Sequence, residues 1–232
     1  MFRHRQQQPD APRHIQALIL TPTRELAIQI DDSIRSYGRY LPLKHTVIFG
    51  GVNQRSQVQA LRAGVDILVA TPGRLLDLLQ QRILTLAHIR FFVLDEADRM
   101  LDMGFIQEVR RIIEQLPARR QTLFFSATMP PEIQQLSHML LSNPVKVEVT
   151  PQSSTVELID QKLYFTEKHN KRALLLHLLQ DSSMKRVLVF TQMKHAADRL
   201  AQQLNKAGVP AVALHGNKTQ GARQKALEQF RQ

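Results

Sequence analysis

Short apolar runs that end in small or hydroxyl-bearing residues alternate with segments of helical periodicity over the first 150 residues. Runs of this length, rich in β-branched and aromatic residues, predict buried strands, whereas apolar side chains three or four positions apart predict amphipathic helices. Strands that alternate with helices form a parallel sheet with helices on both faces, so the sequence predicts an α/β fold. The expected strands are 15–20, 46–49, 66–70, 91–94 and, with its polar end, 121–128.

The five predicted strands all end in loops of similar chemistry. Because parallel strands point the same way, their carboxyl ends meet at one edge of the sheet, and open α/β sheets bind their ligands at that edge. We therefore expect a functional site built from these loops. The loops are Thr21-Pro22-Thr23-Arg24, Gly50-Gly51, Thr71-Pro72-Gly73-Arg74, Asp95-Glu96-Ala97-Asp98 and Ser126-Ala127-Thr128.

The loop after the fourth strand carries three acidic residues. The apolar residues 91–94 run directly into Asp95 and Glu96, and Asp98 follows two positions later. An Asp at a strand end is how phosphate-transferring enzymes hold Mg²⁺, and an adjacent carboxylate can position or activate a water molecule. The alternative is a strand that ends in an ordinary polar turn. The local sequence leaves both interpretations open.

Two arginines at strand-to-helix turns indicate phosphate binding. Arg24 and Arg74 would act together with the exposed backbone N–H groups of those turns. Gly50, Gly51 and Gly73 lack side chains and would let a sugar–phosphate backbone approach closely. Ordinary turn chemistry explains each of these residues when it is taken alone. Contacts of this kind position a nucleic acid without selecting its sequence.

A second strand–helix pattern follows a segment rich in proline, serine and threonine. That composition predicts a linker at 150–157 between two domains, 1–149 and 158–232. The second domain would contain three strands, each followed by a helix, and would thus be a shorter α/β unit. Strands are expected at 161–165, 187–190 and 211–214, after a last short strand of the first domain at 145–149.

The net charge of +11 favours a polyanionic partner such as nucleic acid, although a basic and inert surface is the simpler alternative. No apolar stretch approaches the roughly 18 residues that a membrane span needs, so no membrane partner is expected. The lack of cysteine excludes disulfides and thiol catalysis and fits a reducing compartment. We therefore expect a cytoplasmic protein.

In order and spacing, the five loops resemble the middle motifs of DEAD-box ATP-dependent RNA helicases. Residues 187–191 resemble the first motif of that family's second domain, and His215-Gly216 with Gln220 and Arg223 resembles the next. The amino-acid sequences of 102–105 and 215–223 are most similar to those of the bacterial RhlE-like branch. The resemblance implies a RecA-like parallel sheet of the P-loop NTPase helicase fold, incomplete, followed by a partial second RecA-like domain.

The resemblance also implies a role for each matching residue in an enzyme that uses ATP and Mg²⁺. Asp95 would hold Mg²⁺ on the ATP phosphates, and Glu96 would orient or deprotonate the attacking water. Asp98, with Ser126 and Thr128, would connect the state of the nucleotide to RNA binding. The two domains would close on ATP and single-stranded RNA and so separate a short duplex locally. The RNA backbone would lie along Pro22, Thr23, Arg24, Gly51, Thr71, Gly73 and Arg74 of the first domain and along Thr191 and Arg223 of the second.

Motifs that build the ATP site of this family are missing from these residues. A phosphate-binding loop needs Gly-x-x-x-x-Gly-Lys-Ser/Thr. The Lys-Thr pair at Lys218-Thr219 has Val212 and Asn217 where the glycines would stand. The arginine-bearing motifs that complete the ATP site from the second domain are missing as well. We therefore expect a fragment of a longer helicase that alone neither hydrolyses ATP nor unwinds RNA.

Two other functions are considered. The first is a non-catalytic, truncated product that binds RNA through its basic loops. The second is a DNA translocase of the same superfamily, which is disfavoured because Thr-Pro-Gly-Arg together with Asp-Glu-Ala-Asp resembles the RNA enzymes.

Overall fold

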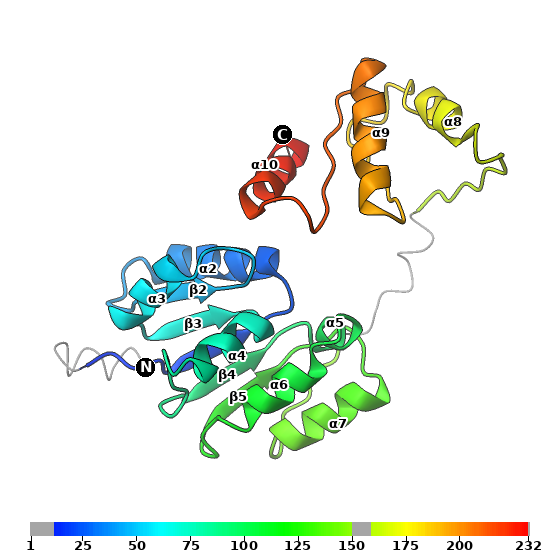
Figure 1. Ribbon diagram of the computed structural model, residues 1–232. Helices are drawn as coiled ribbons and strands as arrows, with labels where there is room; N and C mark the ends of the chain where they lie inside the picture. Colours follow the sequence, from blue (N-terminus) through cyan, green and yellow to red (C-terminus); the bar gives the residue numbers. More distant parts are fainter. Residues whose placement is uncertain (1–11, 150–158, 232) are drawn as a thin grey trace. The chain divides into compact units, whose positions relative to one another are not determined.

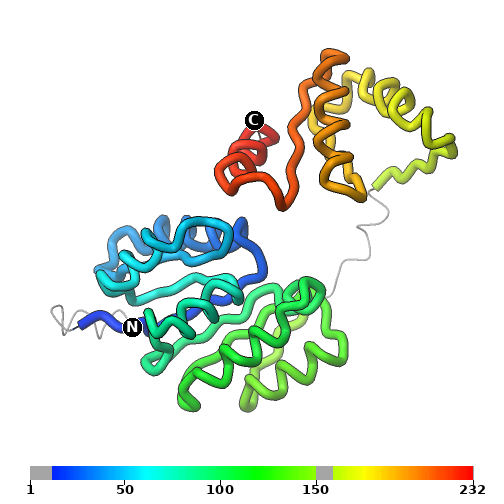
Figure 2. Tube along the Cα trace, viewed as in Figure 1, coloured from blue at the N-terminus to red at the C-terminus, as the bar shows by residue number. Residues whose placement is uncertain are grey.

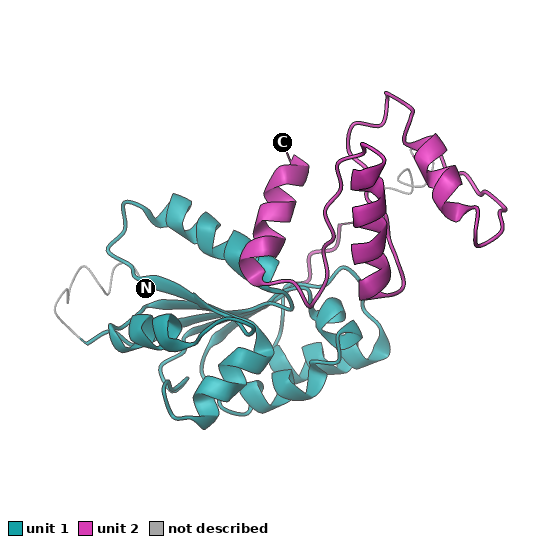
Figure 3. Cartoon of the chain, turned by 45° about the horizontal axis from the view of Figure 1, so that its top comes forward, with its two compact units in different colours: residues 1–145 teal, residues 146–232 magenta. Residues whose placement is uncertain are grey.

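The computed structural model describes residues 12–149 and 159–231. The chain divides into two compact units, residues 1–145 and 146–232, which Figure 3 shows in different colours. Each unit is described by itself. The predicted linker at 150–157 lies outside the described residues, and the predicted domain limits, 1–149 and 158–232, stay a prediction.

Five parallel strands form the sheet of the first unit, which confirms the predicted α/β fold (Figure 1). The central strand β1 pairs with β3 on one side and with β4 on the other, so that Leu20 stands opposite both Ala70 and Leu94. Figure 2 follows the chain through the sheet from blue to green. The strands are β1 (Ala17–Leu20), β2 (His45–Ile48), β3 (Ile67–Ala70), β4 (Phe91–Leu94) and β5 (Gln121–Phe124), in the order β2-β3-β1-β4-β5.

Within residues 12–149, six helices surround this sheet and lie on both of its sides (Figure 3). Thr23 caps the first of them, because its hydroxyl accepts a hydrogen bond from the Leu26 amide at 3.2 Å. None of the described helices is long and apolar enough to cross a membrane. The helices of this unit are α2 (Arg24–Gly38), α3 (Arg55–Arg62), α4 (Pro72–Gln80), α5 (Ala97–Asp102), α6 (Ile106–Ile113) and α7 (Pro131–Leu140).

The core of the first unit includes alternate side chains of the strands together with α4 and α6. Phe92 and Leu94 of β4 are fully buried in one cluster with Val109 and Ile112 of α6. Burying each side chain of this size stabilises the fold by about 1.5–3 kcal/mol relative to leaving it exposed. On β5, which forms an edge of the sheet, Leu123 is 37% exposed. The buried face therefore fixes the register of β1 and β4, the strands whose ends carry the predicted site.

The second unit contains the predicted helices without the predicted strands. Its helices are α8 (Lys171–Leu178), α9 (Lys194–Lys206) and α10 (Gln220–Arg231). No residue of the described range 159–231, or of 145–149, is in a strand. An apolar run forms a strand where a neighbour takes up its backbone N–H and C=O groups, and the described residues form no such ladder here. Phe165 and Phe190 are each 92% exposed. The strands predicted at 145–149, 161–165, 187–190 and 211–214 are therefore wrong.

Candidate functional site

The strand ends meet at one edge of the sheet, as predicted. Four of the loops begin with the same hydrogen bond, which joins the first residue after a strand to the last carbonyl of a neighbouring strand at 2.9–3.1 Å. These bonds hold the starts of the loops level with one another. The pairs are Thr21 with Ala70, Thr71 with Ile48, Asp95 with Leu20 and Phe125 with Leu94.

Asp95 and Glu96 stand where β4 ends. The Glu96 amide donates a hydrogen bond to Oδ1 of Asp95 at 3.0 Å, and the Glu96 backbone is left-handed, with φ 50° and ψ 53°. For a residue other than glycine this conformation costs about 1 kcal/mol or more, and such strain is concentrated at functional sites. The strained residue ends the strand sharply, so that α5 begins at the next residue, Ala97.

The carboxylate of Asp95 suits Mg²⁺ that is held together with phosphate groups. Mg²⁺ keeps several waters and is usually bound by one or two carboxylates plus the phosphates of a substrate. Asp95 offers one carboxylate directly after a buried strand. The side chain of Glu96 is 46% exposed, and its Oε2 lies 3.8 Å from Nε of Arg99. The described part of the chain contains no group of three or more His, Cys, Asp or Glu that could hold a metal ion.

Asp98, Ser126 and Thr128 come together across the ends of β4 and β5. Oδ2 of Asp98 accepts hydrogen bonds from both the backbone N–H and the hydroxyl of Thr128, at 2.9 and 2.8 Å. The Ser126 hydroxyl accepts the Asp98 amide at 3.2 Å and donates to the Thr128 carbonyl at 2.7 Å. These bonds join the first turn of α5 to the loop after β5, so one loop cannot move without breaking contacts with the other.

The same hydrogen bonds set the charge of Asp98. Burial alone would raise the pKa of this carboxyl group, because burial disfavours the charged form. The hydroxyl and amide of Thr128, the Arg99 amide at 3.0 Å and Ser126 outweigh burial and hold the pKa of Asp98 below its ordinary value. Asp98 is therefore ionised near neutral pH and acts as an acceptor for the loop after β5.

Arg24, which begins α2, lies against Gly51 in the loop after β2. Gly51 has a φ of +77°, which favours glycine, and a β-carbon at this position would overlap the Arg24 guanidinium group. The structure thus brings together two of the residues predicted to contact RNA. The absence of a side chain at Gly51 is what makes this close approach possible.

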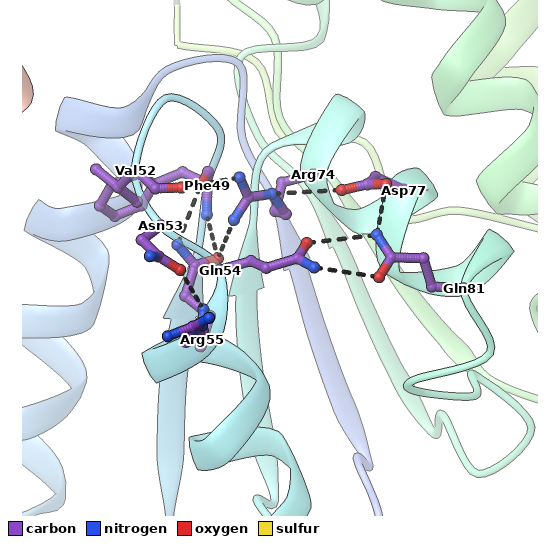
Figure 4. Close-up of polar contacts among 9 residues, drawn as sticks. Phe49, Val52, Asn53, Gln54, Arg55, Arg74, Asp77 and Gln81 are labelled. Atoms are coloured by element: carbon purple, nitrogen blue, oxygen red, sulfur yellow. Dashed lines mark hydrogen bonds and ion pairs between the residues drawn. The ribbon is translucent and has the colours of Figure 1, made fainter.

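The guanidinium group of Arg74 is turned toward the loop after β2 (Figure 4). Its side chain is 11% exposed, with Nη1 donating to Oε1 of Gln57 and Nη2 to the Val52 carbonyl, both at 3.1 Å. Nε lies 3.7 Å from Oδ2 of Asp77. A direct contact of Arg74 with a phosphate stays a prediction. In the structure this side chain fixes the loop that carries Gly51.

The other predicted RNA-contacting residues of the first unit differ in exposure. Pro22 is buried, and Thr71 is 8% exposed at the N-cap of α4. Gly73 is exposed, and a β-carbon added there would meet no atom of the described residues within 4 Å. Gly73 therefore offers open backbone surface to a ligand, whereas Pro22 and Thr71 shape the loops from within.

In the second unit, Thr191 lies before α9 and Arg223 lies in the first turns of α10. The Thr191 hydroxyl donates a hydrogen bond to the Met193 carbonyl at 3.2 Å. The Arg223 amide donates to the Thr219 carbonyl at 3.0 Å. Thr191 therefore lies two residues before the N-cap of α9, and Arg223 lies in the first turn of α10.

The second unit has a pocket of about 590 Å³, whose lining begins at the residue after Thr191. Asp198 lines this pocket and contacts two basic side chains that line it as well. Oδ1 of Asp198 lies 2.7 Å from Nζ of Lys218, and Oδ2 lies 3.0 Å from Nε2 of His215. The bond from Lys218, followed by that from His215, holds the pKa of Asp198 below its ordinary value. The three side chains join α9 to the segment before α10.

Two well-connected residues, Gln57 and Asp198, are absent from the sequence predictions. Gln57 is 7% exposed on α3, four positions before Leu61, which packs against the core. A polar residue on the apolar side of a predicted helix was the available signal. Asp198 gives no such signal, because an acidic residue within a polar helix is ordinary.

A parallel α/β sheet that carries strand-end carboxylates, a Ser-Ala-Thr loop bonded to them, and glycine and arginine loops beside them defines a RecA-like helicase core. Residues 2–136 match the DEAD/DEAH box helicase family, and residues 170–232 match the helicase conserved C-terminal domain. The chain belongs to the DEAD/DEAH box helicase family.

Curated plant proteins are similar to almost the whole chain. The chain is 41% identical over 218 residues to "DEAD-box ATP-dependent RNA helicase 20" of Arabidopsis thaliana, and the aligned region covers 92% of this chain and 43% of that relative. The chain is 42% identical over 228 residues to "DEAD-box ATP-dependent RNA helicase 52A" of Oryza sativa subsp. japonica, and that aligned region covers 93% of this chain and 38% of the relative. The chain thus spans about two fifths of the length of these relatives.

Proposed function

We propose that this protein serves as an ATP-dependent RNA helicase, in which RNA-stimulated ATP hydrolysis is coupled to local unwinding of an RNA duplex. The observation that carries the proposal is the junction of Asp98 with Thr128, because it joins the loop of the two strand-end carboxylates to its neighbour. Both relatives quoted above carry the words ATP-dependent RNA helicase in their names.

The proposed chemistry divides between the two carboxylates that follow β4. Asp95 would hold Mg²⁺, which when bound offsets the negative charge of the ATP phosphates. Glu96 would orient or deprotonate the attacking water, a role that suits a partly exposed carboxylate in a strained turn. Asp98, which is hydrogen-bonded to Ser126 and Thr128, would connect the state of the bound nucleotide to RNA binding.

RNA would be bound through its backbone, without sequence specificity. Arg24 and Gly51 support this role because they form one surface, and Gly73 because its backbone is open. The second domain, proposed to begin at 158 after a linker at 150–157, would contribute Thr191 and Arg223. The proposed RNA surface comprises Pro22, Thr23, Arg24, Gly51, Thr71, Gly73, Arg74, Thr191 and Arg223.

A second candidate function is RNA binding without catalysis. The observation that favours it is the lack of a Gly-x-x-x-x-Gly-Lys-Ser/Thr motif in the 232 residues, since that loop clamps the β- and γ-phosphates of ATP. On this account the chain is a truncated product that keeps its basic RNA-contacting loops, and Asp95 and Glu96 lack the phosphate contacts that catalysis needs. We propose further that the protein belongs to the bacterial RhlE-like branch, because of the amino acids at 102–105 and 215–223. We also propose that it is cytoplasmic, which its lack of cysteine fits.

RNA binding and phosphate release by the purified chain test these proposals together. Fluorescein-labelled oligouridylate should bind with a Kd that rises steeply with salt, because phosphate contacts release counterions. RNA-stimulated phosphate release that disappears in Glu96→Gln would show catalysis by this chain. RNA binding that ATP does not alter, with no phosphate release, would favour the second candidate. Failure to bind RNA at low salt would contradict both.

A further inference from the structure

Gln57, a neutral and almost fully buried residue of α3, bonds to the loop that carries Gly50 and Gly51 at the first residue of that loop, Phe49. We propose that Gln57 is a positioning residue, which holds this loop in the conformation that receives the RNA backbone. The inference rests on the proposed function, because it assigns the loop a role in RNA binding.

The carboxamide of Gln57 binds Phe49 as a neighbouring strand would. Nε2 of Gln57 donates to the Phe49 carbonyl at 3.1 Å, and Oε1 accepts the Phe49 amide at 3.3 Å. β2 ends at Ile48, whose carbonyl accepts the last bond from β3 through the Thr71 amide. Gln57 thus satisfies both backbone groups of the residue after the strand, at the point where the chain turns into the glycine pair.

Arg74 forms the second attachment of the same loop. Oε1 of Gln57 accepts Nη1 of Arg74 at 3.1 Å, which directs Nη2 to the Val52 carbonyl at 3.1 Å. Asp77 lies 3.7 Å from Nε on the remaining side of the guanidinium group. The loop is therefore held at Phe49 by Gln57 and at Val52 by a guanidinium group that Gln57 orients.

The glycine pair lies between these two attachments. Gly51 has a positive φ, and its α-carbon faces the Arg24 guanidinium group without room for a β-carbon. The position of Gly51, and hence the surface that it forms with Arg24, depends on where Phe49 and Val52 are held. Gln57 would act on RNA through this surface, without touching the RNA itself.

Substitutions at Gln57 can separate its bonds from its volume. Gln57→Met keeps the length of the side chain and removes all three bonds. Gln57→Glu keeps acceptors for Arg74 and for the Phe49 amide, but sets a carboxylate oxygen against the Phe49 carbonyl. Gln59→Met is the matched control, because Gln59 is an exposed residue of the same helix. Unfolding midpoints show that the variants are folded under the conditions of the assay.

Amide hydrogen exchange of the full chain tests the attachment without RNA. Gln57→Met should exchange faster at the Phe49 amide, which donates to Oε1 of Gln57, whereas Gln59→Met should match the wild type. Gln57→Glu should also exchange faster there, because a carboxylate oxygen facing the Phe49 carbonyl pushes the loop away from α3. Unchanged exchange at Phe49 in Gln57→Met would overturn the proposal, whatever the outcome with RNA.

Binding of labelled oligouridylate tests the consequence for RNA. Gln57→Met should weaken binding about tenfold, the usual effect of losing a net hydrogen-bond contribution, and should lower the salt dependence although it changes no charge. In an Arg24→Ala background the further loss of affinity should be small, because both residues act on one surface.

Wild-type affinity in Gln57→Met, or full additivity with Arg24→Ala, would overturn the inference and leave the proposed function standing. A wild-type chain that does not bind RNA would instead overturn the proposed function, and exchange at the Phe49 amide would still decide the role of Gln57 in the loop.

Discussion

The guanidinium group of Arg24 lies against the α-carbon of Gly51, so that a side chain at Gly51 would occupy the space of the arginine head. Arg24 comes from the first turn of α2 and Gly51 from the loop after β2. The two loops contribute to one surface only because the second of them carries glycine in a left-handed conformation, with φ +77°.

We expect Gly51→Ala to displace Arg24 and to strain the loop. The left-handed conformation should cost about 1 kcal/mol for alanine, which lowers the unfolding midpoint of a chain of this size by about 2–4 °C. RNA affinity should fall more than stability does, since the contact surface is reshaped. Gly104→Ala is the control, because Gly104 also has a positive φ, +78°, and a β-carbon added there meets no atom of the described residues within 4 Å. Equal RNA affinities for the two variants would contradict the role of the close approach.

The second prediction concerns the pH dependence of the bonds to Asp98. Because the folded-state pKa of Asp98 lies below the unfolded value, its stabilisation is complete above the unfolded value and is lost as the pH falls through the folded value. Asp98→Asn should therefore lower the free energy of unfolding from about pH 5 to 8, and the deficit should shrink below about pH 4. The effect should not exceed about 1 kcal/mol, because the carboxylate is near solvent.

Denaturant titrations at a series of pH values measure this difference between Asp98→Asn and the wild type. Asp102→Asn, at an exposed position of the same helix, is the control. A deficit that grows as the pH falls would mean that the hydrogen bonds from Thr128 do not favour the ionised form.

The first unit could be predicted from the sequence because its local signals and its packing agree. The apolar residues 91–94 have neighbouring strands on both sides, so the run forms the strand that its composition favours. The Thr23 cap and the loops at the strand ends follow from local sequence in the same way. In the second unit the residues 187–190 are equally apolar, but the described residues supply no ladder for them, and pattern alone does not form a sheet.

The candidate site was predictable at its backbone positions and less so at its side-chain contacts. The trio of Asp98, Ser126 and Thr128 assembles because β4 and β5 are neighbours, which the alternation of strands and helices allows but does not require. The partners of Arg74 could not be inferred, because a guanidinium group at a turn can bind either a phosphate or a backbone carbonyl. Only the position of Gln57 in three dimensions decides between them.

We expect Arg74→Lys to behave as a disruptive change. The planar guanidinium group bonds Gln57 and the Val52 carbonyl at once, both at 3.1 Å, and a single ammonium group does not reproduce that fork. The free energy of unfolding should fall by about 1–2 kcal/mol, and RNA affinity should fall with it. Arg62→Lys, at the exposed end of α3, should match the wild type in both measurements. Wild-type RNA affinity in Arg74→Lys would show that charge alone suffices at this position.

A last prediction separates stability from RNA binding. Arg13 forms an ion pair with Asp66, which is fully buried and also accepts the Lys44 amide at 2.9 Å, while Arg13 donates to the Pro42 carbonyl at 3.2 Å. Asp66 precedes β3, so the pair lies at the edge of the sheet opposite the strand-end loops. Arg13→Met should lower the free energy of unfolding by about 3 kcal/mol, because it removes the ion pair of a buried carboxylate. Adding Asp66→Asn should recover part of that loss, since the double variant buries no carboxylate charge at this position, and denaturant titration measures both. The affinity of the folded protein for oligouridylate should stay at the wild-type value, and a fall in that affinity would mean that the two edges of the sheet are not independent.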